Sequence, residues 1–268
     1  MSRTPSVGVI LITYNEADRL ERTLQSVRWA DELVVVDSGS TDGTEAIARR
    51  YTARFVHHAW PGYGPQKQYA LELATTDWVL EVDADEVVSP ELREAIRRAV
   101  AAPGEHAGFT VERPMYYLGA WFGLGDFRRE RKLRLVRRTR ARFRPYQIHE
   151  GLDVDGPVGH LRAPLLHYSY RDMTHHVAKL NEFTSIIAQQ RRRRGQRGGA
   201  LAAVFHGWVY FFKLYLLQGG FLHGRAGLVL AALNGFNGFL KHAKLWELEL
   251  QERAPPAEPA PARSVAER

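Results

Sequence analysis

The chain of 268 residues contains no cysteine, and that absence excludes two kinds of structure. Without thiols there is no disulfide framework and no thiolate metal site. A lack of cysteine is compatible with the cytosol, although it does not by itself place a protein there. Features of a secretory signal peptide are missing too, because the first apolar run is short and leads into acidic, helix-like sequence.

Long uncharged hydrophobic runs are also missing from the C-terminal third. Its apolar stretches are interrupted at Lys213, Arg225 and Lys241, and the longest, Ala226–Leu240, has 15 residues. A spanning helix needs about 18 or more. The basic run RRRRGQR at 191–197 then favours helices that lie in the membrane interface, with their cations at anionic headgroups. Buried helices that pack on the rest of the chain or on a second subunit are an equally open alternative.

Positive charge is in excess, with a net charge of +7 and a pI near 9.7. Such a balance favours an anionic partner, which could be nucleic acid, a membrane surface or a phosphorylated substrate. The excess is concentrated at 126–144, where nine arginines and one lysine face two acids. Guanidinium groups pair bidentately with phosphate oxygens, so this run suits a phosphorylated substrate as well as a solvated basic face.

The first hundred residues alternate between apolar runs of strand length and helix-like segments. Near-continuous Val, Ile and Leu strands separated by helices predict a mainly parallel sheet with helices on both faces. The predicted strands are 7–13, 33–37, 54–57 and 78–82, and the predicted helices are 16–28, one that ends at 50, 66–74 and 90–100. Ser89 is the expected cap of the last helix, with Pro90 in its first turn.

Polar clusters follow three of these strands: Thr13-Tyr14-Asn15-Glu16, residues 37–43 (DSGSTDG) and Asp83-Ala84-Asp85-Glu86. Ligands bind beyond the carboxyl ends of the strands in such sheets, so the three clusters should converge on one crevice. Taken singly, each cluster is also compatible with helix caps and turn residues. The crowded acids at 83–86 need positive charge between them, and an Asp-x-Asp pair can hold a divalent cation that bridges a diphosphate.

These motifs carry a resemblance. TYNE, VVDSGSTDGT and LEVDADE, each after its strand, are similar to the nucleotide-sugar half of glycosyltransferase family 2, which has the GT-A fold. The segment 62–86, with LRLVRR at 133–138 and QIHEGL at 147–152, resembles the lipopolysaccharide inner-core β-1,4-glucosyltransferase branch of that family. The resemblance implies an α/β, GT-A-type nucleotide-binding domain followed by a helical C-terminal region.

The resemblance also implies roles for matching residues. The backbone of Thr13, Tyr14, Asn15 and Glu16 and the carboxylate of Asp37 would hold the uracil ring of a UDP-sugar. Asp83 would contact the ribose, and Asp85 would bind Mn²⁺ or Mg²⁺ on the diphosphate. Lys67 resembles a basic residue near the nucleotide, the alternative being a solvated helix lysine. His167 resembles an additional metal ligand, the alternative being a packed histidine.

An inverting transfer needs a base that deprotonates the acceptor hydroxyl. Glu150 in the segment QIHE is the candidate, because it follows the strand-like segment RLVRR on the acceptor side. Many relatives place a Glu-Asp pair here, whereas this chain has His149-Glu150, and Asp126 is therefore the alternative base.

Four regions are expected along the chain: a nucleotide-sugar half at 1–105, an acceptor-binding half at 106–170, a helical region at 171–250 and a disordered tail at 251–268. The expected activity is transfer of a hexose, glucose by resemblance, from a UDP-sugar to a phosphorylated glycan or lipopolysaccharide acceptor. The expected location is the cytoplasmic, inner face of the bacterial inner membrane, with no nucleic acid as partner. A basic scaffold that binds nucleic acid or membrane is the non-enzyme alternative, and salt-sensitive DNA binding without UDP binding would favour it.

Overall fold

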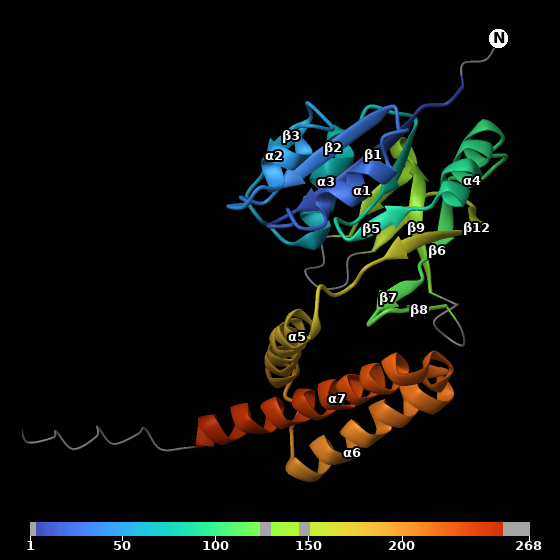
Figure 1. The fold of residues 1–268 in the computed structure, drawn as a ribbon. Helices are drawn as coiled ribbons and strands as arrows, with labels where there is room; N and C mark the ends of the chain where they lie inside the picture. Colours follow the sequence, from blue (N-terminus) through green and yellow to red (C-terminus); the bar gives the residue numbers. More distant parts are fainter. Residues whose placement is uncertain (1–3, 124–129, 145–150, 254–268) are drawn as a thin grey trace, which may run out of the picture. The chain divides into compact units, whose positions relative to one another are not determined.

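A computed structural model of the chain describes residues 4–123, 130–144 and 151–253 (Figure 1). The chain divides into two compact units, Met1–Ser169 and Tyr170–Arg268. Asp126, His149 and Glu150 lie outside the described residues, as does most of the tail that was expected to be disordered.

The first unit is built on a ten-stranded sheet with the strand order β3-β2-β1-β4-β9-β6-β12-β7-β8, and β5 pairs with β12. A separate antiparallel pair is formed by β10 and β11. The strands are β1 Val7–Thr13, β2 Glu32–Asp37, β3 Phe55–His57, β4 Trp78–Glu81, β5 Glu86–Val88, β6 Gly108–Glu112, β7 Met115–Tyr117, β8 Ala120–Phe122, β9 Arg131–Arg137, β10 Ala141–Phe143, β11 Leu152–Val154 and β12 Val158–His167.

Seven of these strands run in the same direction. β1 is parallel to β2 and β4, β2 is parallel to β3, and β12 is parallel to β6 and β7. β9 lies between β4 and β6 and is antiparallel to both, so β6 and β12 point the same way as β4. The prediction of a mainly parallel α/β sheet is therefore confirmed. The carboxyl ends of β1, β2, β4, β6 and β12 meet at one edge of the sheet.

Helices cover both faces of the sheet. Successive side chains of a buried strand point to opposite faces, so the apolar side chains of each such strand pack against helices on both sides. Val9 of β1 packs into a cluster with the apolar stripe of α4, and Leu11 packs with α1. Ile10, which lies between them, packs with α3 on the other face. These helices are α1 Leu20–Ser26, α2 Thr44–Ala48, α3 Tyr63–Leu73 and α4 Pro90–Ala101.

The sequence predicted the start of α4 correctly and the start of α1 too early. Ser89 Oγ accepts a hydrogen bond from Leu92 N at 3.0 Å, which is the expected cap. The helix expected from Glu16 begins only at Leu20. Residues 16–19 instead form a turn, in which the N–H groups of Arg19 and Leu20 both donate to the Glu16 carbonyl.

The second unit is helical, as expected. It consists of α5 Met173–Arg193, α6 Ala200–Phe212, a π-helical turn η3 Lys213–Leu217, a short 3₁₀ helix η4 Gly220–His223 and α7 Gly224–Arg253. The side chain of Asp172 caps α5 by accepting from His175 N at 2.7 Å. Lys244 of α7 ties the two long helices together, since its Nζ lies 2.9 Å from Thr184 Oγ1 and 2.7 Å from Ser185 Oγ of α5.

The expectation that no apolar segment of this unit reaches spanning length is wrong. The helical stretch Ala200–Leu217 has 18 residues and a mean hydropathy of 1.5, so by length and composition it is long and apolar enough to cross a membrane. The apolar segment predicted from the sequence ends at Lys213. A single lysine near the end of an apolar helix can place its amine at the membrane interface, so it does not end the apolar segment.

A pH-dependent stability is expected from His176 of α5. Its ring is buried and stacks on Tyr170 with centroids 3.8 Å apart. Burial, with the positive charges of His175 and Lys179, lowers the pKa of His176 to about 4. The unfolded chain binds this proton near pH 6.5 and the folded chain only near pH 4. The unfolded state therefore holds more protons between these values, and stability falls as the pH falls from 6.5 towards 4.

The measurement is urea unfolding of the wild type and of His176→Phe at several pH values between 7 and 4.5. The wild-type free energy of unfolding should fall by up to about 1.4 kcal/mol per pH unit from this group, and His176→Phe should lack that part of the slope. Equal slopes for both proteins would show that other groups cause the acid sensitivity.

Candidate active site

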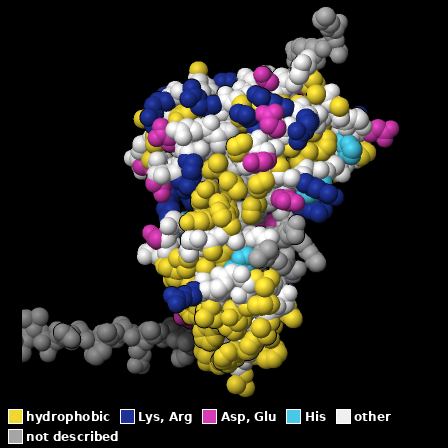
Figure 2. Space-filling model, turned by 45° about the vertical axis from the view of Figure 1, so that its right-hand side comes forward, with side chains coloured by type: hydrophobic (Ala, Val, Ile, Leu, Met, Phe, Trp, Pro, Cys, Tyr) yellow, Lys and Arg dark blue, Asp and Glu magenta, His cyan; other side chains and the backbone are white. Residues whose placement is uncertain are grey.

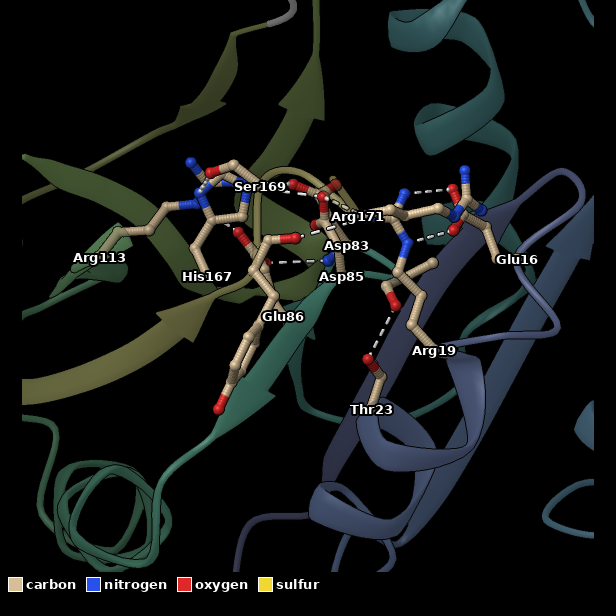
Figure 3. A network of polar contacts seen from close by, with 12 residues as sticks. Glu16, Arg19, Thr23, Asp83, Asp85, Glu86, Arg113, His167, Ser169 and Arg171 are labelled. Atoms are coloured by element: carbon tan, nitrogen blue, oxygen red, sulfur yellow. Dashed lines mark hydrogen bonds and ion pairs between the residues drawn. The ribbon is translucent and has the colours of Figure 1, made fainter. Parts of the chain in front are cut away.

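The edge where the carboxyl ends of the strands meet collects acids and bases from four strands (Figure 3). Asp83 and Asp85 follow β4, and Glu86 is the first residue of β5. Arg113 directly follows β6, and His167 is the last residue of β12. Each of these residues stands at or just beyond a strand end, where a ligand can reach it without disrupting the sheet.

Asp83 is held by cations of the chain itself. Its Oδ1 lies 2.9 Å from Lys67 Nζ, and its Oδ2 lies 2.7 Å from Arg134 Nη2. Burial raises the pKa of this carboxyl, but the charges of Lys67 and Arg113 outweigh burial and hold the pKa at about 2. Asp83 is therefore a carboxylate at every physiological pH.

Glu86 lies at the buried centre of the network. Arg134 Nη2 donates to its Oε1 at 2.7 Å, Arg113 Nε donates to the same oxygen, and Asp83 N donates to Oε2 at 2.9 Å. Burial and the nearby charge of Asp83 raise the pKa of Glu86 to about 8, against the opposing effect of Arg113. Because its oxygens are occupied inside the protein, Glu86 holds Arg113, Arg134 and the backbone of Asp83 in place.

Lys67 is buried, with 3% of its surface exposed, so the alternative of a solvated helix lysine does not hold. Its Nζ lies 2.7 Å from Glu81 Oε1, and Arg134 pairs with the other oxygen of Glu81. The sequence assigned the neutralisation of the acids at 83–86 to a divalent cation. In the structure Lys67, Arg113 and Arg134 supply that positive charge for Asp83 and Glu86, so a metal is not needed to hold these two acids.

Asp85 has different partners. Its Oδ2 lies 3.5 Å from His167 Nε2 and 3.7 Å from Arg19 Nη1. Ser169 Oγ lies 2.8 Å from His167 Nδ1, which fixes the ring with Nε2 towards Asp85. Burial raises the pKa of Asp85, but the hydrogen bond and charge of His167 lower it further than burial raises it. Burial lowers the pKa of His167.

A carboxylate and an imidazole whose donor atoms face each other are a suitable donor pair for a divalent metal. Asp85 and His167 fit that description. Among the residues that the structure describes, no third His, Cys, Asp or Glu joins them. Any further ligands of such a cation would therefore come from a substrate or from water.

The loops after β1 and β2 are joined by hydrogen bonds and form one wall of the site. Asn15 has a left-handed backbone with φ 51°, and its Oδ1 accepts from Thr41 N at 2.8 Å. Asn15 N donates in return to Ser40 Oγ at 2.8 Å, and Glu16 N donates to Thr44 Oγ1 at 2.9 Å. The expectation that the first two polar clusters converge is therefore met by direct hydrogen bonds.

Thr13 and Asp37 end neighbouring strands in register. Asp37 is fully buried and accepts from Gly39 N at 2.9 Å and from Ser40 N at 2.8 Å, so it shapes the turn. Thr13 Oγ1 is buried and has no hydrogen-bond partner among the described residues. Tyr14, in contrast, exposes 57% of its surface.

A cavity of about 360 Å³ adjoins the network. Five basic residues, two acidic residues and several apolar side chains line it. The lining residues are Lys67, Glu81, Asp83, Arg113, Arg131, Lys132, Leu133, Arg134, Phe143, Gly151 and Leu152. A larger groove of about 810 Å³ lies by the amino end of β2, far along the strand from these residues, and is lined by Glu32 and Leu33 among others.

Comparison with known families decides the identity of this site. The glycosyl transferase family 2 profile matches residues 8–152, more than half of the chain. The chain belongs to glycosyltransferase family 2. It is thus a glycosyltransferase, and the matched region contains all three polar clusters together with Lys67 and Arg134.

Relatives share nearly the whole length of this glycosyltransferase. The lipopolysaccharide core biosynthesis glycosyltransferase LpsC of Rhizobium meliloti is 34% identical over 90% of this chain and 92% of its own. An uncharacterized glycosyltransferase of Rickettsia bellii is 30% identical over 92% of this chain and 88% of its own. A solved structure of glucosyl-3-phosphoglycerate synthase from Mycobacterium tuberculosis, with Mn²⁺ and UDP-glucose, aligns at 25% identity and a TM-score of 0.37, over 41% of this chain and 44% of that one.

Sequence reasoning missed four residues of the glycosyltransferase site. Arg19, Arg113 and Arg134 pair with the acids at 83–86, and Glu81 pairs with Lys67 and Arg134. Glu81 had a detectable signal, since a charge inside an otherwise apolar strand needs a buried partner. Arg134 was counted in the basic run 126–144, but nothing in that run distinguishes it from its exposed neighbours.

Loss of Arg134 should destabilise the fold more than its surface neighbours do. Arg134→Met removes the shared partner of Glu81, Asp83 and Glu86, so Lys67 and Arg113 alone remain to balance these buried acids. Removing one member of such a buried group costs about 3–5 kcal/mol. Urea unfolding at pH 7.5 should show this loss, and Glu81→Gln in the same chain should restore part of it.

The matched control is Arg142→Met, because Arg142 of β10 is exposed. Its effect should stay within about 0.5 kcal/mol, as is usual for surface substitutions. A similar, small change for both variants would mean that the network does not stabilise the fold.

Proposed function

We propose that the protein is an inverting hexosyltransferase that moves glucose from UDP-glucose to the inner core of lipopolysaccharide. The observation that supports a metal-assisted transfer is the pair Asp85 and His167. This pair lies at the same edge of the sheet as the loops after β1 and β2. A lipid-linked or other cell-surface glycan is the alternative acceptor. The likeness to the core biosynthesis enzyme of Rhizobium meliloti favours lipopolysaccharide.

The donor nucleotide is proposed to lie against the wall formed by the loops after β1 and β2. Thr13 Oγ1 is a buried hydroxyl without a partner in the described chain, so it can bond a uracil or ribose group at little desolvation cost. Asp37 stands beside it at the end of β2 and reads the imide N–H of uracil in this proposal. Asp83 lies further along the same edge, towards the ribose.

Asp85 and His167 would hold Mn²⁺ or Mg²⁺. Bound there, the cation would supply Lewis-acid neutralisation of the departing diphosphate. Arg19 lies 3.7 Å from the same carboxylate oxygen and adds a fixed positive charge. Lys67, Arg113 and Arg134 keep Asp83 ionised and in position without taking part in the transfer.

The proposed reaction is a single in-line displacement. A bond forms between the acceptor oxygen and the anomeric carbon, the bond from that carbon to the diphosphate oxygen breaks, and UDP leaves with the electron pair. The acceptor hydroxyl proton passes to a carboxylate base, proposed to be Glu150, with Asp126 as the alternative. Inversion follows because the acceptor enters on the face opposite to the leaving group.

The cationic cavity suits an acceptor that carries phosphate. Arg131 and Lys132 are exposed at its rim, and Arg113 and Arg134 lie deeper. Guanidinium groups bind phosphate oxygens bidentately, which gives both affinity and orientation. Phe143 and Leu152 add apolar surface against which a sugar ring can pack.

The test is a product assay of the pure protein with a panel of UDP- and GDP-sugars, with Mn²⁺ or with EDTA. The acceptors are a truncated inner-core lipopolysaccharide, the same acceptor after phosphate removal, and a lipid-linked sugar. The proposal expects transfer only from UDP-glucose with metal to the phosphorylated core, with inverted anomeric configuration in the product. Transfer of another sugar would overturn the proposed donor, and transfer to the lipid-linked acceptor would overturn the proposed acceptor. Retention of the anomeric configuration would overturn the inverting mechanism.

A further inference from the structure

α6 and α7 form a helical hairpin whose seam is made of very small residues. A Cβ added to Gly235 of α7 would lie 2.9 Å from Gly207 O of α6, and one added to Gly238 would lie 2.8 Å from His206 O. Both contacts are shorter than a side chain tolerates. The two backbones therefore touch directly, which only glycine at these positions allows.

The same face of α7 also meets η4, where a Cβ added to Gly227 would meet Gly220 O. Gly227, Ala231 and Gly235 are spaced four residues apart, so they share one face of the helix, and all three are buried. Spacing small residues by four lets two helices approach closely without large side chains between them.

Large apolar side chains occupy the outer surface of the hairpin instead. In α6 the single buried residue is Ala203, whereas Leu201 exposes 88% of its surface and Phe205 64%. Figure 2 shows hydrophobic side chains gathered over these helices. The exposed set is Leu201, Val204, Phe205, Trp208, Val209, Phe212, Leu216, Leu217, Phe221, Leu222, Leu228, Phe236, Trp246 and Leu250.

This arrangement is the reverse of that in the first unit. On α4 the apolar residues Leu92, Ile96 and Val100 are buried and the charged residues face outwards. In the hairpin small residues line the seam and many of the large apolar residues face outwards. Only 11% of the window Ala200–Leu217 is buried, so it is not a core helix among the residues that the structure describes. An outer surface of this kind requires an apolar surrounding.

Positive charge lies at one end of the apolar surface. α6 contains no Asp, Glu, Lys or Arg over its 13 residues, which span about 20 Å at 1.5 Å per residue. The open end of the hairpin carries the basic run 191–197, because Arg191 Nη1 lies 3.2 Å from His242 Nε2 of α7. Arg193, Arg194 and Arg197 of that run are exposed. Exposed cations beside an apolar helix match anionic headgroups above acyl chains.

We infer that the α6–α7 hairpin is embedded in an anionic lipid bilayer. Its large outward side chains lie among the acyl chains, and the arginines at its open end lie at the headgroups. This inference is independent of the sugar and acceptor proposed above. A second copy of the chain is the competing occupant of the apolar surface, and it would leave the arginines without an anionic partner.

The absence of cysteine allows a direct test, since a single introduced cysteine can be labelled without background. Phe212→Cys and Leu217→Cys place an environment-sensitive NBD dye on the apolar surface, and Ala46→Cys places it on the exposed side of α2 as control. Vesicles of phosphatidylethanolamine and phosphatidylglycerol should shift NBD emission to the blue at 212 and 217. Spin labels on the acyl chains should quench it there, with no change at 46.

Two outcomes would overturn the inference. Emission at 212 and 217 that vesicles leave unchanged would exclude lipid contact. Emission that is already blue-shifted before vesicles are added, together with a dimer in sedimentation, would assign the surface to a second copy. As a further arm, Arg193→Gln, Arg194→Gln and Arg197→Gln together should weaken vesicle binding at low salt on the order of 10²-fold. Unchanged binding of this triple variant would contradict the role of the headgroups.

Discussion

Replacement of Asp85 by alanine is expected to abolish sugar transfer while the fold stays intact. Asp85 is the carboxylate of the network that faces His167 rather than the cations Lys67, Arg113 and Arg134. Its removal deletes one of two proposed metal ligands, so the departing diphosphate loses its charge neutralisation. The measurements are transfer rate, and UDP binding by calorimetry with and without Mn²⁺.

The matched control is Asp155→Ala, because Asp155 is an exposed acid on the same unit. It should transfer at the wild-type rate. Asp85→Ala should also retain the wild-type circular dichroism and unfolding midpoint, since Asp83 and Glu86 keep their partners. Transfer by Asp85→Ala at the normal rate would show that the metal role proposed for Asp85 is wrong.

Replacement of Glu150 by glutamine is expected to slow turnover by roughly 10²- to 10⁴-fold, the usual cost of a lost general base. Glutamine keeps the shape and the hydrogen bonding of the side chain but cannot accept the acceptor proton. Affinity for the UDP-sugar should hardly change, because the base acts on the acceptor. Steady-state kinetics with the donor and the acceptor varied separately measure both quantities.

Asp126→Asn is the comparison, and it should slow turnover far less. Both residues lie outside the described part of the chain, so kinetics rather than distances must decide between them. If Asp126→Asn is the slower enzyme, Asp126 is the base and the His149-Glu150 pair has another role.

The sheet and the loops after β1 and β2 could be predicted from local sequence. A strand buried on both faces is a continuous apolar run, and its end is marked by the first polar residue, as at Thr13 and Asp37. Parallel strands place those ends on one edge, so linear order along the chain becomes proximity in space. The loop contacts between Asn15 and Thr41 follow directly from that rule.

The charge balance of the site could not be predicted in this way. Arg113 and Arg134 come from β6 and β9, and β9 enters the sheet antiparallel between β4 and β6. Which arginine of a basic run faces inwards depends on strand register, and a shift of one residue would turn Arg134 away from Glu81 and Glu86. The sequence therefore predicted an acidic metal site, and the structure shows an ion-pair network beside the pair Asp85 and His167.

For the C-terminal helices, too, part of the structure could be predicted from the sequence and part could not. The sequence by itself determined that the region 171–250 is helical and that its stretch 200–240 is apolar, because composition and the glycine-ended basic run are local features. Only the tertiary structure decided which side chains face outwards. Helix pairing at Gly207, Gly235 and Gly238 brings backbones into contact, and the large residues must then point away from the seam. That orientation depends on contacts between residues distant in the chain, which no local pattern encodes.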